Sequence, residues 1–288
     1  MLSIASVLPP LPRLKIVDVG AMWTGGDADR YANLVRALPC DVIGFEPVAA
    51  EYQKLVAMGR PQHRYFPYFI GDGSTRVFYE CRAPFTSSLF EPDLAMARTF
   101  EHLAEALQVI RTHQVQTTRL DDIAEAAGVD FLKVDVQGAE IMVFQGAAAC
   151  LKSAVIVDVE VDFIPLYKTQ PLFADVDSFL RSQGFMLHQM QHYNLSFKPK
   201  VAKNEGAATS QQTAWGDAVY VRDFPAFERL EPHSLLKLAA ILHENYRSYD
   251  LAARALGAYD RMMPTDLQSR YARLVASSST PASAGRAT

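Results

Sequence analysis

Acidic residues and glycines follow several short apolar segments in the first quarter of the chain. Asp18 and Gly20 close the first segment, Glu46 closes the second, and Asp72 and Gly73 follow the third. A glycine in such a turn lets a ligand approach the backbone closely. A glutamate after the second segment can accept two hydrogen bonds from the hydroxyls of a ribose. Gly20 together with Glu46, 26 residues further on, therefore indicates a nucleoside-binding site.

The loop after Gly20 does not have the glycine spacing that a pyrophosphate group needs. Residues 21–26 are Ala-Met-Trp-Thr-Gly-Gly, so the GxGxxG fingerprint of dinucleotide-binding proteins is missing. Asp72 offers an acceptor for the amino group of adenine, although an ordinary Asp-Gly turn is the alternative. Recognition of adenosine without a phosphate-binding loop favours S-adenosylmethionine over a nicotinamide dinucleotide as the cofactor.

A second group of charged residues alternates with apolar residues in two later segments. Lys133 and Asp135 are two positions apart, as are Asp158, Glu160 and Asp162, so each set lies on one face of its strand. Charges in a buried strand are unfavourable unless they are paired. We therefore expect Lys133 to neutralise a nearby carboxylate, and we assign Asp135 and Glu160, at the strand ends, to the site. The candidate partners of Lys133 are Asp121, Asp122 and Asp158.

Three side chains are candidate catalytic bases for a hydroxyl group, in the order Asp135, Glu160 and His192. His192 follows the predicted sixth strand, where it is expected near the mouth of the cleft. Two acids are too few to assign a metal site. HExxH, EF-hand, Walker and GxSxG motifs do not occur in the sequence, which argues against a metalloprotease, a kinase and an α/β-hydrolase.

Strands and helices alternate along the chain, which predicts an α/β fold with a doubly wound, parallel sheet. In such a sheet, ligands bind at the carboxyl ends of the strands, where the residues above are found. The predicted strands are 14–19, 41–45, 65–70, 129–135, 154–160, 185–190 and 218–221, with extra strands at 75–81 and 112–118. The predicted helices are 27–38, 48–58, 139–151 and 173–182, with a helical insertion at 91–108.

The pattern predicts one α/β domain with appended segments. We expect an N-terminal extension over 1–13, the α/β domain over 14–223, a helical extension over 224–276 and a disordered tail over 277–288. The helices of the extension are compatible with the formation of a homodimer. They are predicted at 234–246, 251–262 and 265–275.

Composition limits the classes of partner and compartment. The 288 residues are 49% hydrophobic and 21% charged, and 28 basic against 32 acidic residues leave a net charge of −4. This balance argues against a broad nucleic-acid surface. The N-terminus lacks the features of a targeting signal, and no stretch approaches the roughly 20 apolar residues of a transmembrane helix. Three widely spaced cysteines without a CxxC motif predict a reducing, cytoplasmic location.

The motifs together resemble the FkbM-type methyltransferases. The resemblance rests on residues 16–21, 44–47 and 118–122, and most specifically on 131–140, the block from Phe131 to Glu140. It runs in the expected order over about residues 14–222. It implies a Rossmann-like sheet of seven strands whose last strand is antiparallel. It also implies methyl transfer from S-adenosylmethionine to a hydroxyl group of a sugar, glycan or related natural product.

The resemblance also implies how the cofactor would lie. The methionine part is expected near Asp18, Gly20 and Ala21, the ribose at Glu46 beside Pro47, and the adenine near Asp72 and Gly73. Two departures from the family pattern are Met22-Trp23-Thr24 after Ala21 and Gln137 at a position where the family often has glutamate.

Two other classes of function stay open at this stage. One is a nicotinamide-dependent oxidoreductase or epimerase on a similar sheet, which the missing glycine loop disfavours. The other is a non-catalytic adaptor that binds a partner through the C-terminal helices.

Overall fold

The protein is described by a computed structural model that covers residues 3–23, 25, 29–199 and 211–278. The chain divides into two compact units. The sheet unit contains residues 15–26 and 41–223, and the helical unit contains residues 1–14, 27–40 and 224–288. The segment between the first two strands thus groups with the C-terminal helices, which the strand and helix pattern does not predict. The predicted tail from residue 279 on, and the start of the predicted helix 27–38, lie outside the described residues.

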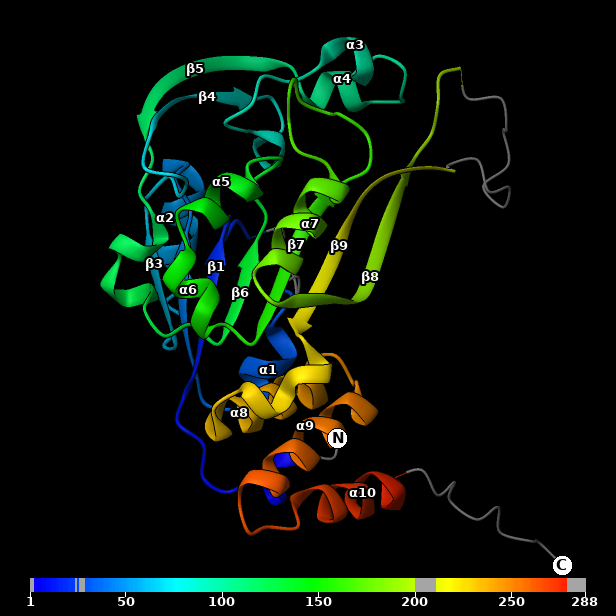
Figure 1. Cartoon of the computed structure of the whole chain (residues 1–288). Coiled ribbons are helices and arrows are strands. Elements are labelled where there is room, and N and C mark those ends of the chain that lie inside the picture. The colour runs from blue at the N-terminus through cyan, green and yellow to red at the C-terminus, as the bar shows by residue number, and fades with distance from the viewer. Residues whose placement is uncertain (1–2, 24, 26–28, 200–210, 279–288) are drawn as a thin grey trace, which may run out of the picture. The chain divides into compact units, whose positions relative to one another are not determined.

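The main sheet has seven strands in the order β3-β2-β1-β6-β7-β9-β8 (Figure 1). Neighbouring strands among the first five run parallel, and β9 runs antiparallel to both of its neighbours. The expectation of a seven-stranded sheet with an antiparallel last strand is confirmed. The strands are β1 (Leu14–Val19), β2 (Cys40–Phe45), β3 (His63–Phe66), β6 (Phe131–Val134), β7 (Ile156–Asp162), β8 (Phe185–Leu195) and β9 (Gln212–Arg222).

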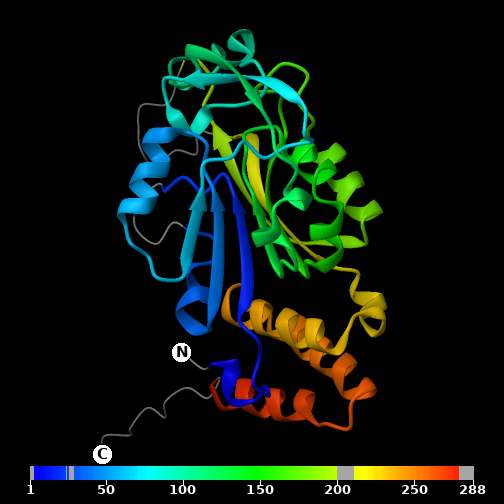
Figure 2. The same cartoon turned by 90° about the vertical axis from the view of Figure 1, so that its left-hand side faces the viewer.

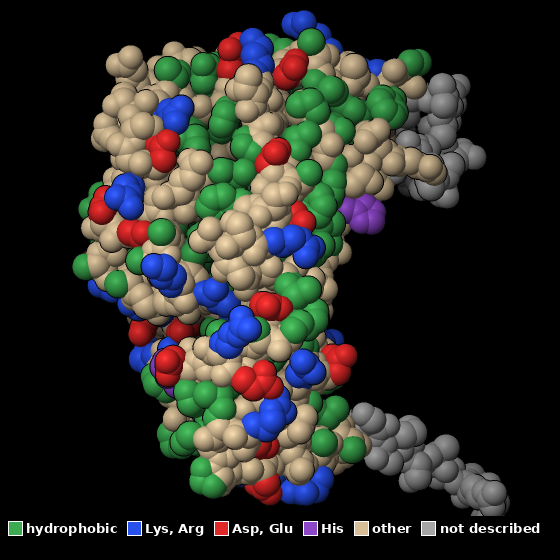
Figure 3. Space-filling view, viewed as in Figure 1, with side chains coloured by type: hydrophobic (Ala, Val, Ile, Leu, Met, Phe, Trp, Pro, Cys, Tyr) green, Lys and Arg blue, Asp and Glu red, His purple; other side chains and the backbone are tan. Residues whose placement is uncertain are grey.

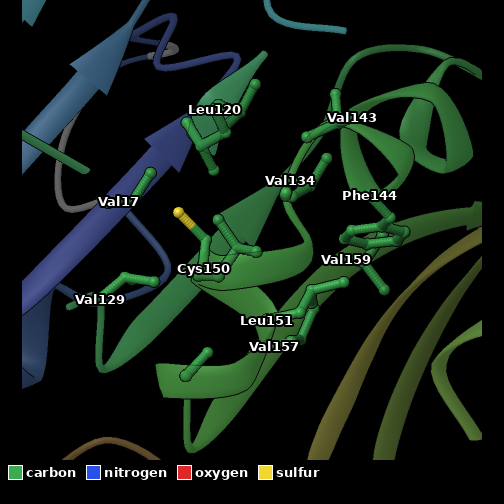
Figure 4. Packing of buried hydrophobic residues seen from close by; sticks show 14 of the residues in the cluster. Val17, Leu120, Val129, Val134, Val143, Phe144, Cys150, Leu151, Val157 and Val159 are labelled. Atoms are coloured by element: carbon green, nitrogen blue, oxygen red, sulfur yellow. The ribbon is translucent and has the colours of Figure 1, made fainter. Parts of the chain in front are cut away.

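One face of the sheet packs against α5 (Glu140–Gln145), α6 (Ala148–Ser153) and α7 (Phe173–Ser182). Val17, Val134 and Val157 point from three adjacent strands toward Phe144 and Leu151 of the helices (Figure 4). Branched side chains suit parallel strands that are buried on both faces, and their burial is the main source of stability here. The alternate positions of the same strands carry Asp18, Lys133, Asp158 and Glu160, because successive side chains point to opposite faces.

A separate two-stranded sheet follows β3. It consists of β4 (Thr75–Cys81) and β5 (Val109–Gln116), paired antiparallel. The parallel strands of the main sheet point toward this hairpin in both views (Figures 1 and 2). The hairpin and the segment between its strands therefore lie beyond the carboxyl ends of the parallel strands. That segment contains α3 (Leu94–Ala97) and α4 (Leu103–Ala106), two short helices where one longer helical insertion was predicted.

Several predicted boundaries differ from the structure. β3 ends at Phe66 rather than at residue 70, because Pro67 has no N–H for the strand ladder. The helix predicted over 139–151 is two helices that separate at Gly146. β8 and β9 are each 11 residues long, since their polar outer portions pair with each other and not with the apolar core. Helix α2 (Ala49–Ala57) lies within the predicted range.

The helical unit contains α1 (Ala32–Ala37), α8 (Pro232–Glu244), α9 (Tyr249–Met262) and α10 (Leu267–Ser278). α8 and α9 bury leucine and alanine side chains against each other. Glu244 on α8 accepts hydrogen bonds from the Ser3 hydroxyl (2.8 Å) and the Ile4 amide (2.9 Å), which fixes the N-terminal segment to this unit.

Basic and acidic side chains are interspersed over the surface seen in Figure 3. Within the described residues, no helix is both long and apolar enough to cross a membrane.

Candidate active site

A pocket of about 750 Å³, including space open to solvent, lies at the carboxyl ends of β1, β2 and β6. Most of its wall is apolar or aromatic, and the polar lining comes from strand ends and from Ser87 and Ser88. Four of the residues predicted from the sequence line it, namely Gly20, Glu46, Pro47 and Asp135. The arrangement matches the rule that open α/β sheets bind ligands where the strand order reverses, here between β1 and β6.

Gly20 lies where the end of β1 meets the end of β6. Its φ is +80°, and a Cβ atom at this position would stand 1.8 Å from the carbonyl oxygen of Asp135. The Gly20 and Ala21 amides both donate to the Phe45 carbonyl of β2 at 3.0 Å. Only glycine combines this conformation with this close approach, so the turn joins three strands beside the pocket.

Gly20→Ala is expected to disrupt this junction. Gly128→Ala is the matched control, because Gly128 has a φ of +72° with nothing within 4 Å of the added Cβ. The strain of the left-handed backbone alone is worth about 1–2 kcal/mol, or roughly 3 °C in the unfolding midpoint. Gly20→Ala should lower the midpoint in a thermal melt by at least about twice as much. Equal midpoints for the two variants would contradict the close packing at Gly20.

Glu46 is the buried acid of the pocket, with 3% of its surface exposed. Its Oε1 accepts the amide of Val48 at 2.8 Å, and this is the only hydrogen bond to its carboxylate from the described residues. Burial raises the pKa of Glu46 to about 7. A buried carboxylate with one hydrogen bond from the protein is suited to accept further hydrogen bonds from ligand hydroxyls.

An aromatic wall faces Glu46, and the sequence reasoning did not assign it to the site. Tyr68 and Phe69 follow β3, Phe78 comes from β4, and Phe85 comes from the segment after β4. Phe85 and Tyr68 are 59% and 42% exposed, which is unusual for large apolar rings at a pocket. The aromatic run over residues 65–69 was a visible signal, but it was interpreted as a strand.

Lys133 is the central charge beneath the pocket. Its Nζ lies 3.1 Å from Asp18 Oδ1 and 3.6 Å from Asp135 Oδ2, and it donates to the Gly20 carbonyl at 2.7 Å. Burial alone would lower the pKa of Lys133, but the carboxylates of Asp18 and Asp135 outweigh it and keep that pKa above its usual range.

The prediction that Lys133 neutralises a carboxylate is therefore confirmed, but the partners are not the predicted ones. The Asp121 carboxylate accepts the amides of Ala149 and Cys150 at the start of α6 instead. Asp158 lies beside Lys133 in the strand register. Asp18 does not line the pocket, since it lies beneath the turn and neutralises the lysine.

Asp135 and Glu160 come together through Gln137. The Gln137 amide nitrogen donates to Asp135 Oδ1 at 2.9 Å and to Glu160 Oε2 at 2.5 Å. Asp135 and Gln137 line the pocket, and Glu160 lies behind them on β7. Burial, with Asp135 beside it, raises the pKa of Glu160 well above its usual range. The sequence pointed to Asp135 and Glu160, whereas the connection through Gln137 is visible only in the structure.

The other predicted site residues lie apart from the pocket. Asp72 bonds to the amide of Ser74 (3.0 Å) and to Arg76 (2.9 Å), and Gly73 donates to Thr117. His192 lies within β8 at the edge of the sheet, and the strand register puts it on the opposite face from Glu160. The cofactor role of Asp72 and Gly73 and the catalytic role of His192 stay predictions.

The fold and pocket define a class, namely Rossmann-like proteins with a seven-stranded sheet and a pocket at the carboxyl end of the first strand. Sequence comparison then specifies the family. Residues 18–187 match the profile described as the methyltransferase FkbM domain. This is more than half of the chain, and the chain belongs to this family. No curated protein matches the sequence.

Solved structures with a similar fold include two methyltransferases and one further AdoMet-bound protein. Magnesium protoporphyrin IX methyltransferase from Synechocystis PCC 6803, with bound SAM, is 14% identical over 76% of each chain, with a TM-score of 0.36. An S-adenosylmethionine-dependent methyltransferase from Mesorhizobium loti is 10% identical over 76% of this chain and 95% of its own (TM-score 0.38). TYW2 from M. jannaschii, in complex with AdoMet, is 11% identical over 76% and 73% (TM-score 0.33).

Proposed function

We propose that the protein transfers a methyl group from S-adenosylmethionine to a hydroxyl oxygen of a sugar, glycan or related natural product. The observation that carries the proposal is the buried Glu46 carboxylate in an apolar pocket beside the Gly20 turn, in a chain of a methyltransferase family. We further propose residues 14–223 as the methyltransferase domain and 224–276 as an extension.

The residues of the pocket fit this cofactor. Glu46, beside Pro47, would accept the ribose hydroxyls, and the aromatic wall of Tyr68, Phe69 and Phe78 would pack against the adenine ring. The Gly20–Ala21 turn, where Gly20 lines the pocket at the end of β1, would lie beside the methionine part. When bound, S-adenosylmethionine supplies a methyl group that is already strongly electrophilic, so the protein must mainly align the acceptor.

Asp135 is the proposed general base. It lines the pocket, and its two carboxylate oxygens face Gln137 and Lys133. Asp135 would accept the proton that the acceptor hydroxyl loses on methylation. Lys133 lies 3.6 Å from Asp135, and its positive charge balances the negative charge of that carboxylate. Glu160 and His192 are the second and third candidates for the base.

We propose that the acceptor is a hydroxylated small molecule or glycan and not a nucleic acid. We also propose that the protein acts in the cytoplasm. The interspersed surface charges and the net charge of −4 support the first part. The three cysteines, all free and buried, support the second. The exposed helices of the helical unit are the surface through which a homodimer would form.

Titration with S-adenosylhomocysteine by calorimetry tests the cofactor assignment. Glu46→Gln keeps the shape of the side chain but removes its charge and one acceptor, so we expect binding to weaken about 100-fold. Because the pKa of Glu46 is raised to about 7, wild-type affinity should increase as the pH rises from 6 to 8, and this dependence should vanish in the variant.

Glu91→Gln is the matched control, since it makes the same change at an exposed ion pair with Lys168. It should bind like the wild type. Absence of binding to the wild type, or equal affinity of the Glu46 and Glu91 variants, would refute the proposal. Tight binding of NADH instead would revive the oxidoreductase alternative.

A further inference from the structure

Gln137 forms more hydrogen bonds at the pocket than the connection between Asp135 and Glu160 requires. Besides its bonds to Asp135 and Glu160, its side-chain oxygen accepts the Tyr167 hydroxyl at 3.1 Å. Its backbone oxygen accepts the Ser88 hydroxyl at 2.6 Å. Gln137 also has a φ of +57°, a left-handed conformation that is unfavourable for a residue with a side chain.

The hydrogen bonds define which way the amide points. Its nitrogen faces an oxygen of Asp135 and an oxygen of Glu160, and its oxygen faces the Tyr167 hydroxyl, which donates. The reverse orientation would bring the amide oxygen against both carboxylates. Both hydrogens of the amide nitrogen are therefore used, one for each acid of the site.

The same residue is tied to the wall of the pocket. Tyr167 shares its hydroxyl between Gln137 and the carbonyl of Thr86 (2.9 Å), and Ser88 pairs with Tyr79 of β4 through both of its backbone groups. Residues 84, 85 and 87–89 line the pocket. Gln137 thus connects the ends of β6 and β7 to the segment 84–89, which is far from it in the sequence.

We propose that Gln137 is a positioning residue whose amide holds Asp135 and Glu160 side by side and, through Tyr167 and Ser88, sets the place of the wall segment 84–89 relative to them. A carboxamide can do this because it donates twice and accepts once. A carboxyl group at the same place would add a third acid facing the other two, with Lys133 as the neighbouring cation. That these acids and the segment 84–89 belong to a methyltransferase site rests on the proposed function.

Gln137→Glu tests the requirement for an amide. Because the new carboxylate must share a proton with its neighbours or repel them, the variant should become less stable relative to the wild type as the pH rises. We expect the difference in unfolding midpoint to grow by about 5 °C or more between pH 5 and pH 8. The titratable groups around the site are Lys133, Asp135, Glu140, Glu160, Asp162 and Tyr167.

Gln114→Glu is the matched control, since it adds the same charge at an exposed position of β5. Its midpoint difference from the wild type should stay nearly constant over this pH range. A flat difference for Gln137→Glu as well would overturn the role of the amide.

Hydrogen exchange tests the connection to the wall. Tyr167→Phe removes the hydroxyl between Gln137 and Thr86 with little change of volume, and Gln137→Leu removes the amide. In both variants we expect the peptide over residues 84–90 to exchange at least about tenfold faster, with peptides of β1 unchanged. Unchanged exchange of residues 84–90 in both variants would overturn the proposal.

Binding of S-adenosylhomocysteine separates this proposal from the previous one. If the wild type does not bind it, the proposed function fails while the melting and exchange results still decide the role of Gln137. If the wild type binds it, the cofactor assignment stands, and the melting and exchange results decide the role of Gln137 on their own.

Discussion

Lys133→Met is expected to lower the unfolding midpoint of the protein by about 10 °C. The substitution keeps much of the volume of the side chain but leaves Asp18, which is 4% exposed, without its cation. Removing one partner of a buried ion pair typically costs about 3–5 kcal/mol, because an uncompensated charge stays in the interior. A loss of this size in a domain of about 200 residues corresponds to the expected shift. Differential scanning calorimetry measures it directly.

Lys168→Met is the control for the loss of a lysine. Lys168 pairs with Glu91 at 2.6 Å, but both side chains are about half exposed, so water and salt screen the pair. Its removal should change the midpoint little. Adding Asp18→Asn to Lys133→Met should recover part of the lost stability, since a neutral amide replaces the carboxylate that Lys133 neutralises. If the two lysine variants melted together, Lys133 would not be the buried counter-ion described above.

Stability is expected to fall as the pH rises from 5 to 8, and Glu140 should account for a large part of this. Burial, followed by the nearby carboxylate of Asp162, raises the pKa of Glu140 from its ordinary 4.5 to about 8. Between these two values the folded protein binds a proton that the unfolded chain has released. Stability therefore decreases with pH across this window and levels off above pH 8. The expected contribution is on the order of 3 kcal/mol.

Glu140→Gln isolates this contribution. The Glu140 Oε1 accepts the amides of Val136 and Gly138 at 3.1 Å, and a glutamine oxygen can keep both bonds. Chemical unfolding at several pH values should show that the free energy of unfolding depends less on pH in the variant than in the wild type. The variant therefore becomes more stable relative to the wild type as the pH rises. Glu46 and Asp162, whose pKa values burial raises to about 7, add slopes of the same sign in both proteins. Parallel profiles for the two proteins would contradict a buried, protonated Glu140.

Much of the sheet could be predicted from local sequence. β1 and β4 occupy their predicted ranges, and β2 begins one residue earlier than predicted, because short apolar runs end at residues that break strands. The alternation of charge with apolar residues placed Lys133 and Asp135 on one face, since the period of a strand is two. β8 and β9 were underestimated because their outer halves are polar and pair with each other. No hydrophobic pattern marks such a hairpin in advance.

Like the sheet, the candidate site could be predicted only in part from the sequence. By itself, the sequence determined which residues lie at the carboxyl ends of strands. A glycine or an acid after an apolar run marks that end, whatever the position of the strand in the sheet. Only the tertiary structure decided which strands are neighbours. Asp18 meets Lys133 because β1 and β6 are adjacent in register, although more than 100 residues separate them.

Proximity of segments that are distant in the sequence also explains the contacts of Gln137 and the composition of the two units. One glutamine side chain carries no periodic signal, yet the turn after β6 brings it to Asp135, Glu160 and Tyr167 at once. Likewise, the segment 27–40 belongs with the C-terminal helices through contacts between distant parts of the chain. Periodicity determines the face that a side chain occupies, whereas the three-dimensional path of the chain determines what that face meets.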